Sequence, residues 1–196
     1  MMQYCAEKIV GWLIGCNAIK NEDRELYEYA VYSLFLWVVP LFFAVITGVC
    51  LGKVGQSIAV VVPFMMTRKF SGGVHAKYPW VCFICSCTLL GICTYLSGYL
   101  VYGWKMALIT AAAVVLLGYF SPIEHENKKL NEDERKLYKK ITVMITSISW
   151  CVAVALYLLD QGVFAVCISL GILLTAGLQW PVIIKRYLYL FKMPKT

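Results

Sequence analysis

The residues of this sequence whose types could do chemistry gather in one polar stretch, residues 68–79, and in the cysteine that follows it. The stretch contains three cations, a Ser-Gly-Gly turn and His75, which is one of only two histidines in the chain. Cys82 follows that histidine by seven residues. An imidazole can take the proton of a thiol, and the resulting thiolate can attack a carbonyl carbon, which is the chemistry of a thiol protease.

The local sequence predicts that Cys82 lies at the start of a helix. Gly72 and Gly73 allow backbone angles that other residues resist, so the chain can turn sharply before that helix. Pro79 suits the first position of a helix, because its missing N–H would have no partner there. Cys82 then lies about one turn into the helix, where the positive end of the helix dipole and the nearby cations favour a thiolate.

Spacing alone does not assign catalysis to this pair. On one continuous helix, seven residues correspond to about 10 Å of rise, which is too far for a hydrogen bond. The pair works only if His75 lies on the turn and folds back toward the start of the helix that carries Cys82. The residues alone therefore leave two interpretations open: a catalytic pair, or a basic loop with a histidine that is satisfied by its neighbours.

No metal site, cofactor site or redox motif is indicated in the polar stretch. Cys82 and Cys85 form a Cys-x-x-Cys pair, but no thioredoxin-like βαβ pattern surrounds them, and we expect Cys85 to pack within an apolar helix. A metal site needs three or four ligands, and two histidines with scattered thiols do not supply a convincing set. Gly72 and Gly73 lack the remainder of a phosphate-loop pattern. We therefore expect no metal and no cofactor.

A second polar segment, residues 121–140, contains the other histidine, His125. That histidine lies between two glutamates, and we expect it to be solvated rather than catalytic. Glu124 is a candidate to orient His75 if the two polar segments meet, which the sequence leaves open.

The composition indicates an integral membrane protein. Of the 196 residues, 61% are hydrophobic and only 15% are charged, and the mean hydropathy is +0.72, which is too apolar for a soluble domain. The formal charge of +7 is no sign of nucleic-acid binding, because basic residues in membrane proteins mostly mark the loops that face the cytoplasm. The nine cysteines are odd in number and five lie within apolar runs, so we expect small packed residues rather than a disulfide framework.

The apolar pattern predicts an all-α fold with about six transmembrane helices. The expected spans are residues 31–51, 54–67, 80–98, 106–120, 141–159 and 163–179. The second span has only 14 residues. At 1.5 Å per residue it covers about 21 Å, which is less than the hydrocarbon thickness of about 30 Å. We therefore expect the polar stretch after it to be drawn into the membrane boundary, where irregular backbone must be buried in protein or line a wet cavity.

An amphipathic helix is predicted at the N-terminus. Its apolar positions recur at helical spacing and are Met2, Cys5, Ile9, Trp12, Leu13 and Cys16. This helix lies either in the membrane surface or against the helix bundle. We count residues 1–30 as an interfacial N-terminal part and residues 31–196 as the membrane-embedded domain, with polar loops at 68–79 and 121–140.

A capping-box pattern of Asn131 and Glu134 predicts a further helix start inside the second polar segment. Acidic residues come first and basic residues follow, as the helix dipole favours. We expect this helix to run directly into the fifth span, and a basic tail to follow the sixth span.

The distribution of basic residues predicts the topology. With the N-terminus in the cytoplasm and six spans, 16 of the 18 Lys and Arg residues fall on the cytoplasmic side, and only Lys53 and Lys105 fall outside. Such a split is a strong positive-inside signal. It predicts a multi-pass protein with both termini and the His75 loop on the cytoplasmic side.

The polar stretch resembles the signature of the accessory gene regulator protein B family, which are membrane-embedded cysteine endopeptidases of bacterial peptide quorum sensing. The matching run is Arg68-Lys69-Phe70-Ser71-Gly72-Gly73-Val74-His75-Ala76, followed by Cys82. Residues 121–130 also resemble a cytoplasmic loop common in that family, although Lys129 stands where many relatives have proline. Length, span count and the position of the motif agree, so the resemblance covers essentially the whole chain.

The resemblance implies that His75 is the general base and Cys82 the nucleophile. It implies a precursor peptide with an N-terminal amphipathic helix, a central signal segment and an acidic C-terminal tail. Cleavage removes the tail and leaves the signal segment as a thioester on the enzyme, which an internal Cys or Ser attacks to close a thiolactone or lactone ring. The implied setting is a bacterial cell membrane with its lipid bilayer, no nucleic acid, and a homodimer as a candidate assembly.

Cationic loops fit an acidic tail on physical grounds. The residues that we expect to contact the substrate are Arg68, Lys69, Ser71, Gly72, Gly73, Lys128 and Lys129. The competing class is a non-enzymatic membrane protein, such as a small transporter or peptide exporter, which ionisable residues within the spans would favour. The predicted spans contain almost none, and this weakens the competing class.

Overall fold

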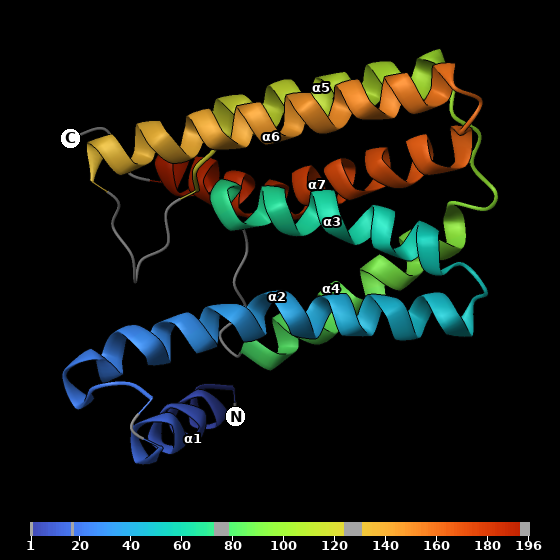
Figure 1. Ribbon diagram of the computed structural model, residues 1–196. Helices are drawn as coiled ribbons and strands as arrows, with labels where there is room; N and C mark the ends of the chain where they lie inside the picture. The colour runs from blue at the N-terminus through green and yellow to red at the C-terminus, as the bar shows by residue number, and fades with distance from the viewer. Residues whose placement is uncertain (1, 17, 73–78, 124–130, 193–196) are drawn as a thin grey trace. The chain divides into compact units, whose positions relative to one another are not determined.

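Helices are the only extended regular elements in the part of the chain that the structure describes (Figure 1). The computed structural model describes residues 2–16, 18–72, 79–123 and 131–192. Its helices are α1 (Met2–Gly15), α2 (Arg24–Cys50), α3 (Val54–Ser71), α4 (Pro79–Leu96), α5 (Trp104–Phe120), α6 (Glu132–Leu158) and α7 (Gly162–Lys192), with a short 3-10 turn at Asn21–Asp23. The prediction of an all-α fold is confirmed.

The chain forms two compact units, Met1–Phe43 and Ala44–Thr196, and the boundary between them falls inside α2. The first unit contains α1 and most of α2. The second contains the end of α2 and the helices α3 to α7. Both polar segments and Cys82 belong to the second unit.

The N-terminal helix α1 exposes much of its predicted apolar stripe. Ile9 and Trp12 are 39% and 67% exposed, and Cys5 is exposed as well. The neighbouring Ala6 and Val10 are buried instead. An exposed apolar stripe is what a helix needs in order to lie in a membrane surface. The surface position of α1 therefore stays a prediction with physical support.

Three helices in the described part of the chain are long and apolar enough to cross a membrane: Asn21–Cys50, Glu132–Leu158 and Gly162–Pro181. Two shorter apolar helices, Ile84–Leu96 and Trp104–Phe120, coincide with most of α4 and with α5. These helices indicate a membrane protein. The six-span arrangement, in which the less apolar α3 is also a span, stays a prediction.

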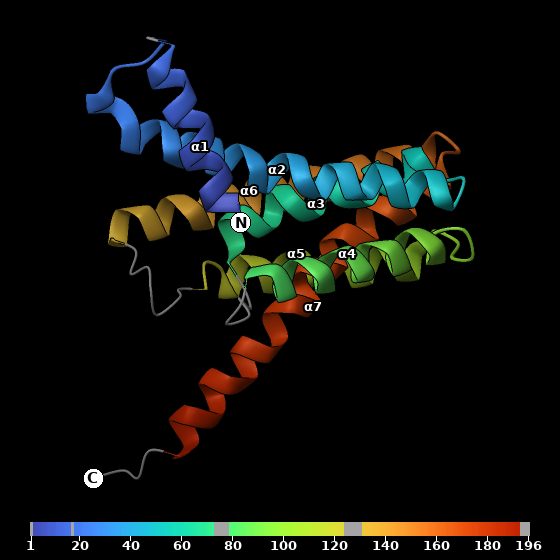
Figure 2. The ribbon, with the colours of Figure 1, turned by 90° about the horizontal axis from the view of Figure 1, so that it is seen from below.

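The helix α3 packs against α4, α6 and α7 in the second unit (Figures 1 and 2). Its buried residues are Ser57, Val60, Val61, Pro63, Phe64, Thr67 and Ser71. On α7, Gly171 permits a close approach of the two helices, because a Cβ there would lie 2.5 Å from the Val60 carbonyl oxygen. A helix packed among others need not match the bilayer thickness by itself, which explains how this short helix can lead into a polar stretch.

Five buried threonines find hydrogen-bond acceptors within their own helices. The threonines at positions 94, 110, 142, 146 and 175 each donate to the carbonyl oxygen four residues earlier, at 2.8–3.0 Å. These bonds satisfy hydroxyl groups that would otherwise be costly to bury. These five threonines can therefore lie in the apolar interior of the unit without needing water.

Two helices extend further than the sequence predicted. The helix α3 continues to Ser71, four residues beyond the predicted end of the second span, so Arg68 and Lys69 belong to its last turn and not to a loop. Both are good helix formers, and their charges suit the negative end of the helix dipole. The helix α7 continues to Lys192, so Lys185 and Arg186, which we expected in a tail, also lie within a helix.

The start of α6 follows the predicted capping box. The Asn131 N–H donates to the carboxylate of Glu134 at 3.1 Å, and the two residues form the reciprocal pair of the motif. The helix then runs without a break from Glu132 to Leu158. The prediction that this helix continues without a break into the apolar run from residue 141 is confirmed.

The cysteines are less buried than we expected. Cys167 is buried, but Cys50, Cys85 and Cys151 are exposed, which corrects the expectation that these three pack in the interior. A thiol behaves as a small apolar group, so it is tolerated on the outer face of an apolar helix. The described cysteines are free thiols.

Candidate active site

The helix α4 begins at Pro79, as the sequence predicted, and Cys82 is therefore its fourth residue. The first N–H groups of a helix have no partner within the helix, and the macrodipole adds a positive potential there. In general, such a helix start favours the thiolate form of a cysteine. The structure describes the place of Cys82 in the helix but not its side chain, and His75 and Gly73 lie outside the described residues.

The stretch that contains His75 leaves α3 at a sharply defined turn. Ser71 ends α3 and is fully buried, and Gly72 follows with φ +71° and ψ −160°. This combination of angles is essentially restricted to glycine. A Cβ on Gly72 would also collide with the carbonyl oxygen of Ile123, so the turn requires glycine for two independent reasons.

The end of α3 is paired with the start of the second polar segment. Gly72 and Ile123 form an isolated parallel bridge, and the Ile123 N–H donates to the Ser71 carbonyl oxygen at 3.0 Å. The bridge lies directly before residues 73–78 on one side and residues 124–130 on the other.

The sequence left open whether the two polar segments meet, and the bridge shows that their starting points do. The segment 73–78 carries His75, and the segment 124–130 begins with Glu124. Both segments lie outside the described residues, so the assignment of Glu124 as an orienting group stays a prediction.

Gln179 of α7 joins the same place. Its side chain is 2% exposed, and its Nε2 donates to the Ser71 carbonyl oxygen and to the Ser121 hydroxyl, both at 3.0 Å. Ser121 is also buried and follows the last residue of α5. We refer to Ser71, Gly72, Ser121, Ile123 and Gln179 as the loop junction. It joins the C-terminal ends of α3 and α5 to α7.

Aromatic and cationic side chains lie around the end of α3. The rings of Phe70 and Tyr138 of α6 meet edge to face, with centroids 5.8 Å apart. The guanidinium of Arg68, which is half-buried, lies 5.6 Å from the centre of the Phe64 ring. The exposed Lys69 places its ammonium 5.8 Å from the centre of the Phe70 ring.

More cations lie on the first turns of α6, which the contact of Phe70 with Tyr138 brings to the end of α3. These exposed residues are Arg135, Lys136, Lys139 and Lys140. Lys128 and Lys129, which we expected to contact the substrate, lie outside the described residues. The described end of α3 and the first turns of α6 therefore carry both cations and the exposed acidic residues Glu132, Asp133 and Glu134.

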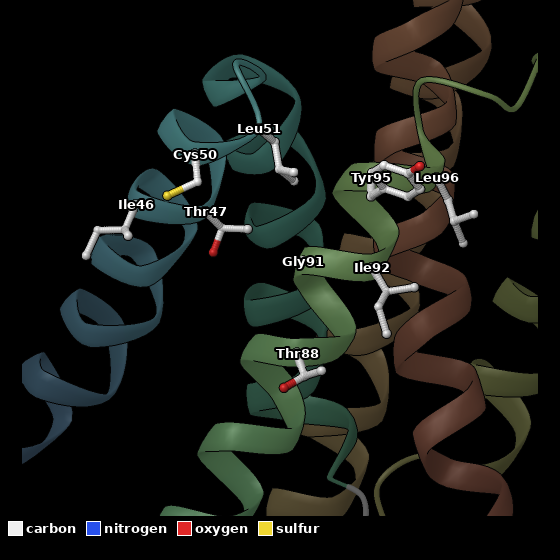
Figure 3. Close-up of a pocket in the computed structure, with 9 residues that line it drawn as sticks. All are labelled: Ile46, Thr47, Cys50, Leu51, Thr88, Gly91, Ile92, Tyr95 and Leu96. Carbon is white, nitrogen blue, oxygen red and sulfur yellow. The ribbon is translucent and has the colours of Figure 1, made fainter.

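An apolar hollow of about 500 Å³ lies between the end of α2 and α4 (Figure 3). Its lining residues are Ile46, Thr47, Cys50, Leu51, Thr88, Gly91, Ile92, Tyr95 and Leu96. No described residue of the predicted site lines it. Within the described residues, no three His, Cys, Asp or Glu side chains gather to hold a metal ion either. The described residues of the predicted site lie instead at the end of α3 and at the start of α4.

Sequence reasoning missed Gln179, Ser121 and Ile123. A signal for Gln179 was present, because an amide in the predicted span 163–179, which holds no charged residue, needs either a buried partner or a function. Ile123 carries no such signal, because it contributes backbone groups and its residue type is ordinary.

Sequence comparison relates the chain to one family. The model of the family described as Accessory gene regulator B (AgrB) matches residues 6–183. AgrB-like protein 2 of Clostridium perfringens strain 13 is 25% identical over 142 residues, which cover 65% of this chain and 64% of that protein, less than two thirds of its length. An AgrB-like protein of Clostridium perfringens strain SM101 is 23% identical over 183 residues, which cover 86% of this chain and 83% of that protein.

No solved structure matches the chain significantly. The residues matched by the family model include the whole polar stretch, Cys82 and the five residues of the loop junction. The chain belongs to the accessory gene regulator B family.

Proposed function

We propose that the chain is a membrane-embedded cysteine endopeptidase that removes the C-terminal tail of an autoinducing-peptide precursor and promotes its cyclisation for quorum sensing. One observation carries the proposal: the segment with His75 starts at a fixed turn, and the chain returns with Cys82 on the first turn of α4. Family membership supports the same activity. Residues 68–76 and Cys82 resemble the family signature, and that resemblance implies that His75 is the general base and Cys82 the nucleophile.

In the first step, His75 takes the thiol proton of Cys82, and the thiolate attacks the carbonyl carbon of the scissile peptide bond. A C–S bond forms as the C–N bond breaks, and the imidazolium gives its proton to the leaving amine of the tail. The products are a free tail and a thioester that joins the signal segment to Cys82.

In the second step, an internal Cys or Ser of the signal segment attacks this thioester. The thiolactone or lactone bond forms, and Cys82 leaves as a thiol, with His75 carrying the proton from the attacking group. Exchange of one thioester for another needs little driving force. A site shielded by protein also disfavours the competing attack by water.

The proposed topology has six spans, α2 to α7, with both termini and the site on the cytoplasmic side of a bacterial cell membrane. The two hydrogen bonds of Gln179 support this topology, because the C-terminal ends of α3 and α5 meet α7 at one place. The C-terminal ends of α3 and α5 can meet the C-terminal part of α7 only if α3, α5 and α7 cross the membrane in the same direction. The excess of Lys and Arg on one side supports the orientation, and the exposed apolar stripe supports a surface position for α1.

The proposed substrate carries an acidic tail, which Arg68 and Lys69 would attract together with Lys128 and Lys129. Ser71 is fully buried and its carbonyl oxygen is occupied by two donors, so we assign it to the support of the turn rather than to substrate contact. A homodimer is compatible with this mechanism, and neither chemical step requires one.

The test uses the purified chain in lipid vesicles with a synthetic precursor peptide. We expect release of the tail, detected by mass spectrometry, and loss of release in Cys82→Ala and in His75→Ala. Cys85→Ala is the matched control, because it removes an exposed thiol three residues further along α4 and should leave cleavage unchanged. Movement of intact precursor across the vesicle membrane without cleavage would support a transporter and contradict the proposal.

A further inference from the structure

We propose that Gln179 is a positioning residue of the peptidase site, whose side-chain amide fixes the direction in which the His75 segment leaves α3. This role rests on the proposed function. Gln179 lies outside the signature and outside both polar segments. The proposed role does not require Gln179 to touch the substrate. Gln179 acts through the backbone of Ser71.

The Ser71 carbonyl needs partners from outside its own helix. The last four carbonyl groups of a helix have no intrahelical donor, and Ser71 is fully buried, so water cannot serve as the substitute. Gln179 Nε2 and the Ile123 N–H both donate to this oxygen at 3.0 Å. Two donors from two other segments fix the orientation of the peptide unit that joins Ser71 to Gly72.

The same amide also places the second polar segment. Gln179 Nε2 donates to the Ser121 hydroxyl at 3.0 Å, and Ser121 lies two residues before the bridge residue Ile123. A single buried side chain on α7 is therefore bonded to the starting points of both polar segments. Its loss should change how these segments are placed relative to each other and to Cys82.

The expected kinetic effect follows from geometry. A displacement of about 1 Å at a reacting group can reduce the rate about 100-fold, so removal of the Gln179 amide should lower kcat by about 10- to 100-fold. The cations that attract the substrate tail remain in place, so KM should change by less than about threefold.

Gln179→Met tests this role, because methionine has a similar size and no hydrogen-bond donor. Thr175→Val is the matched control: Thr175 is buried one turn earlier on α7, and its hydroxyl donates to Gly171 of the same helix at 3.0 Å. Ser121→Ala removes one acceptor and leaves the bond to Ser71, so its effect should fall between those of the two other variants. All are assayed in lipid vesicles with the synthetic precursor.

Hydrogen exchange followed by mass spectrometry adds a readout that does not depend on activity. In Gln179→Met, the peptide that contains Ile123 should exchange faster than in the wild type, because the Ser71 carbonyl that accepts its N–H is no longer held. The body of α3 and of α7 should keep its protection. Thr175→Val should leave the exchange of the Ile123 peptide unchanged.

Unchanged kcat together with unchanged exchange in Gln179→Met would overturn the proposal. An equal loss of kcat in Thr175→Val would also overturn it, because the effect would then come from packing of α7. If Gln179→Met does not fold, the kcat of Ser121→Ala and the exchange of its Ile123 peptide test the proposal instead. Both unchanged from the wild type would overturn it. If the wild-type chain does not cleave the precursor, the peptidase proposal fails, and the exchange measurement still decides whether Gln179 holds the junction.

Discussion

Gly72 and Ile123 lie in backbone contact so close that no side-chain carbon fits on Gly72. The two residues are far apart in the sequence, and each directly precedes one of the two polar segments. Gln179 holds the same place from α7. In the proposed site such a common anchor would limit displacements at the start of each segment, which would otherwise move the reacting groups.

Gly72→Ala should strongly reduce cleavage of the precursor. The new methyl group meets the Ile123 carbonyl, and the backbone angles at this position are strained for alanine by about 1–3 kcal/mol. The measurements are tail release by mass spectrometry and thermal unfolding in detergent.

Gly52→Ala is the control for that substitution. Gly52 also has a positive φ, +64°, but a Cβ there meets nothing within 4 Å. We expect a modest loss of stability with cleavage retained. Equal cleavage by the two variants would contradict the importance of the bridge.

Lys69→Gln should raise KM for a precursor with an acidic tail about two- to fivefold and leave kcat near the wild-type value, because an exposed ion pair contributes up to about 1 kcal/mol. Added salt should reduce the difference from the wild type, since it screens exposed charges. The measurement is the rate of tail release against precursor concentration, at low and at high salt.

Lys105→Gln is the control for Lys69→Gln. Lys105 is also exposed, and its ammonium lies 5.8 Å from the centre of the neighbouring Trp104 ring, but it stands at the start of α5, away from the junction at its end. Its KM should not change. The same increase of KM in both lysine variants would show that the effect is not local to the site.

Reporter fusions after Lys77 and after Asp160 should report opposite sides of the membrane, with the first in the cytoplasm. The physical reason is the excess of Lys and Arg on one side of the six-span threading. A second pair, after Lys53 and after Asp160, should report the same outer side. If the fusions after Lys77 and after Asp160 report the same side, the six-span topology is wrong.

Local signals explain what could be predicted from the sequence. Pro79 restricts the first position of α4, and Asn131 with Glu134 marks the start of α6, so both helix starts lie where neighbouring residues determine them. The family could also be predicted, because residues 68–76 form one short run that resembles its signature.

Tertiary contacts explain what could not be predicted. Arg68 to Ser71 have the polarity of a loop, yet they continue α3, because Ser71 is buried and its carbonyl is satisfied by Gln179 and Ile123. The pairing of Gly72 with Ile123 uses backbone groups of residues from different helices, and no periodicity or motif reports such a contact. Exposure of Cys85 was missed because an apolar run does not indicate which face of a helix is covered.

The most direct test of the account is the capture of the acyl-enzyme on Cys82. The measurement uses a precursor whose ring-closing residue is changed to Ala, followed by acid quenching and peptide mapping by mass spectrometry. The account predicts an adduct on Cys82 that is heavier by the signal segment and is released by hydroxylamine, with Cys82→Ala forming no adduct and releasing no tail. An adduct on Cys85, or tail release by Cys82→Ala, would contradict it.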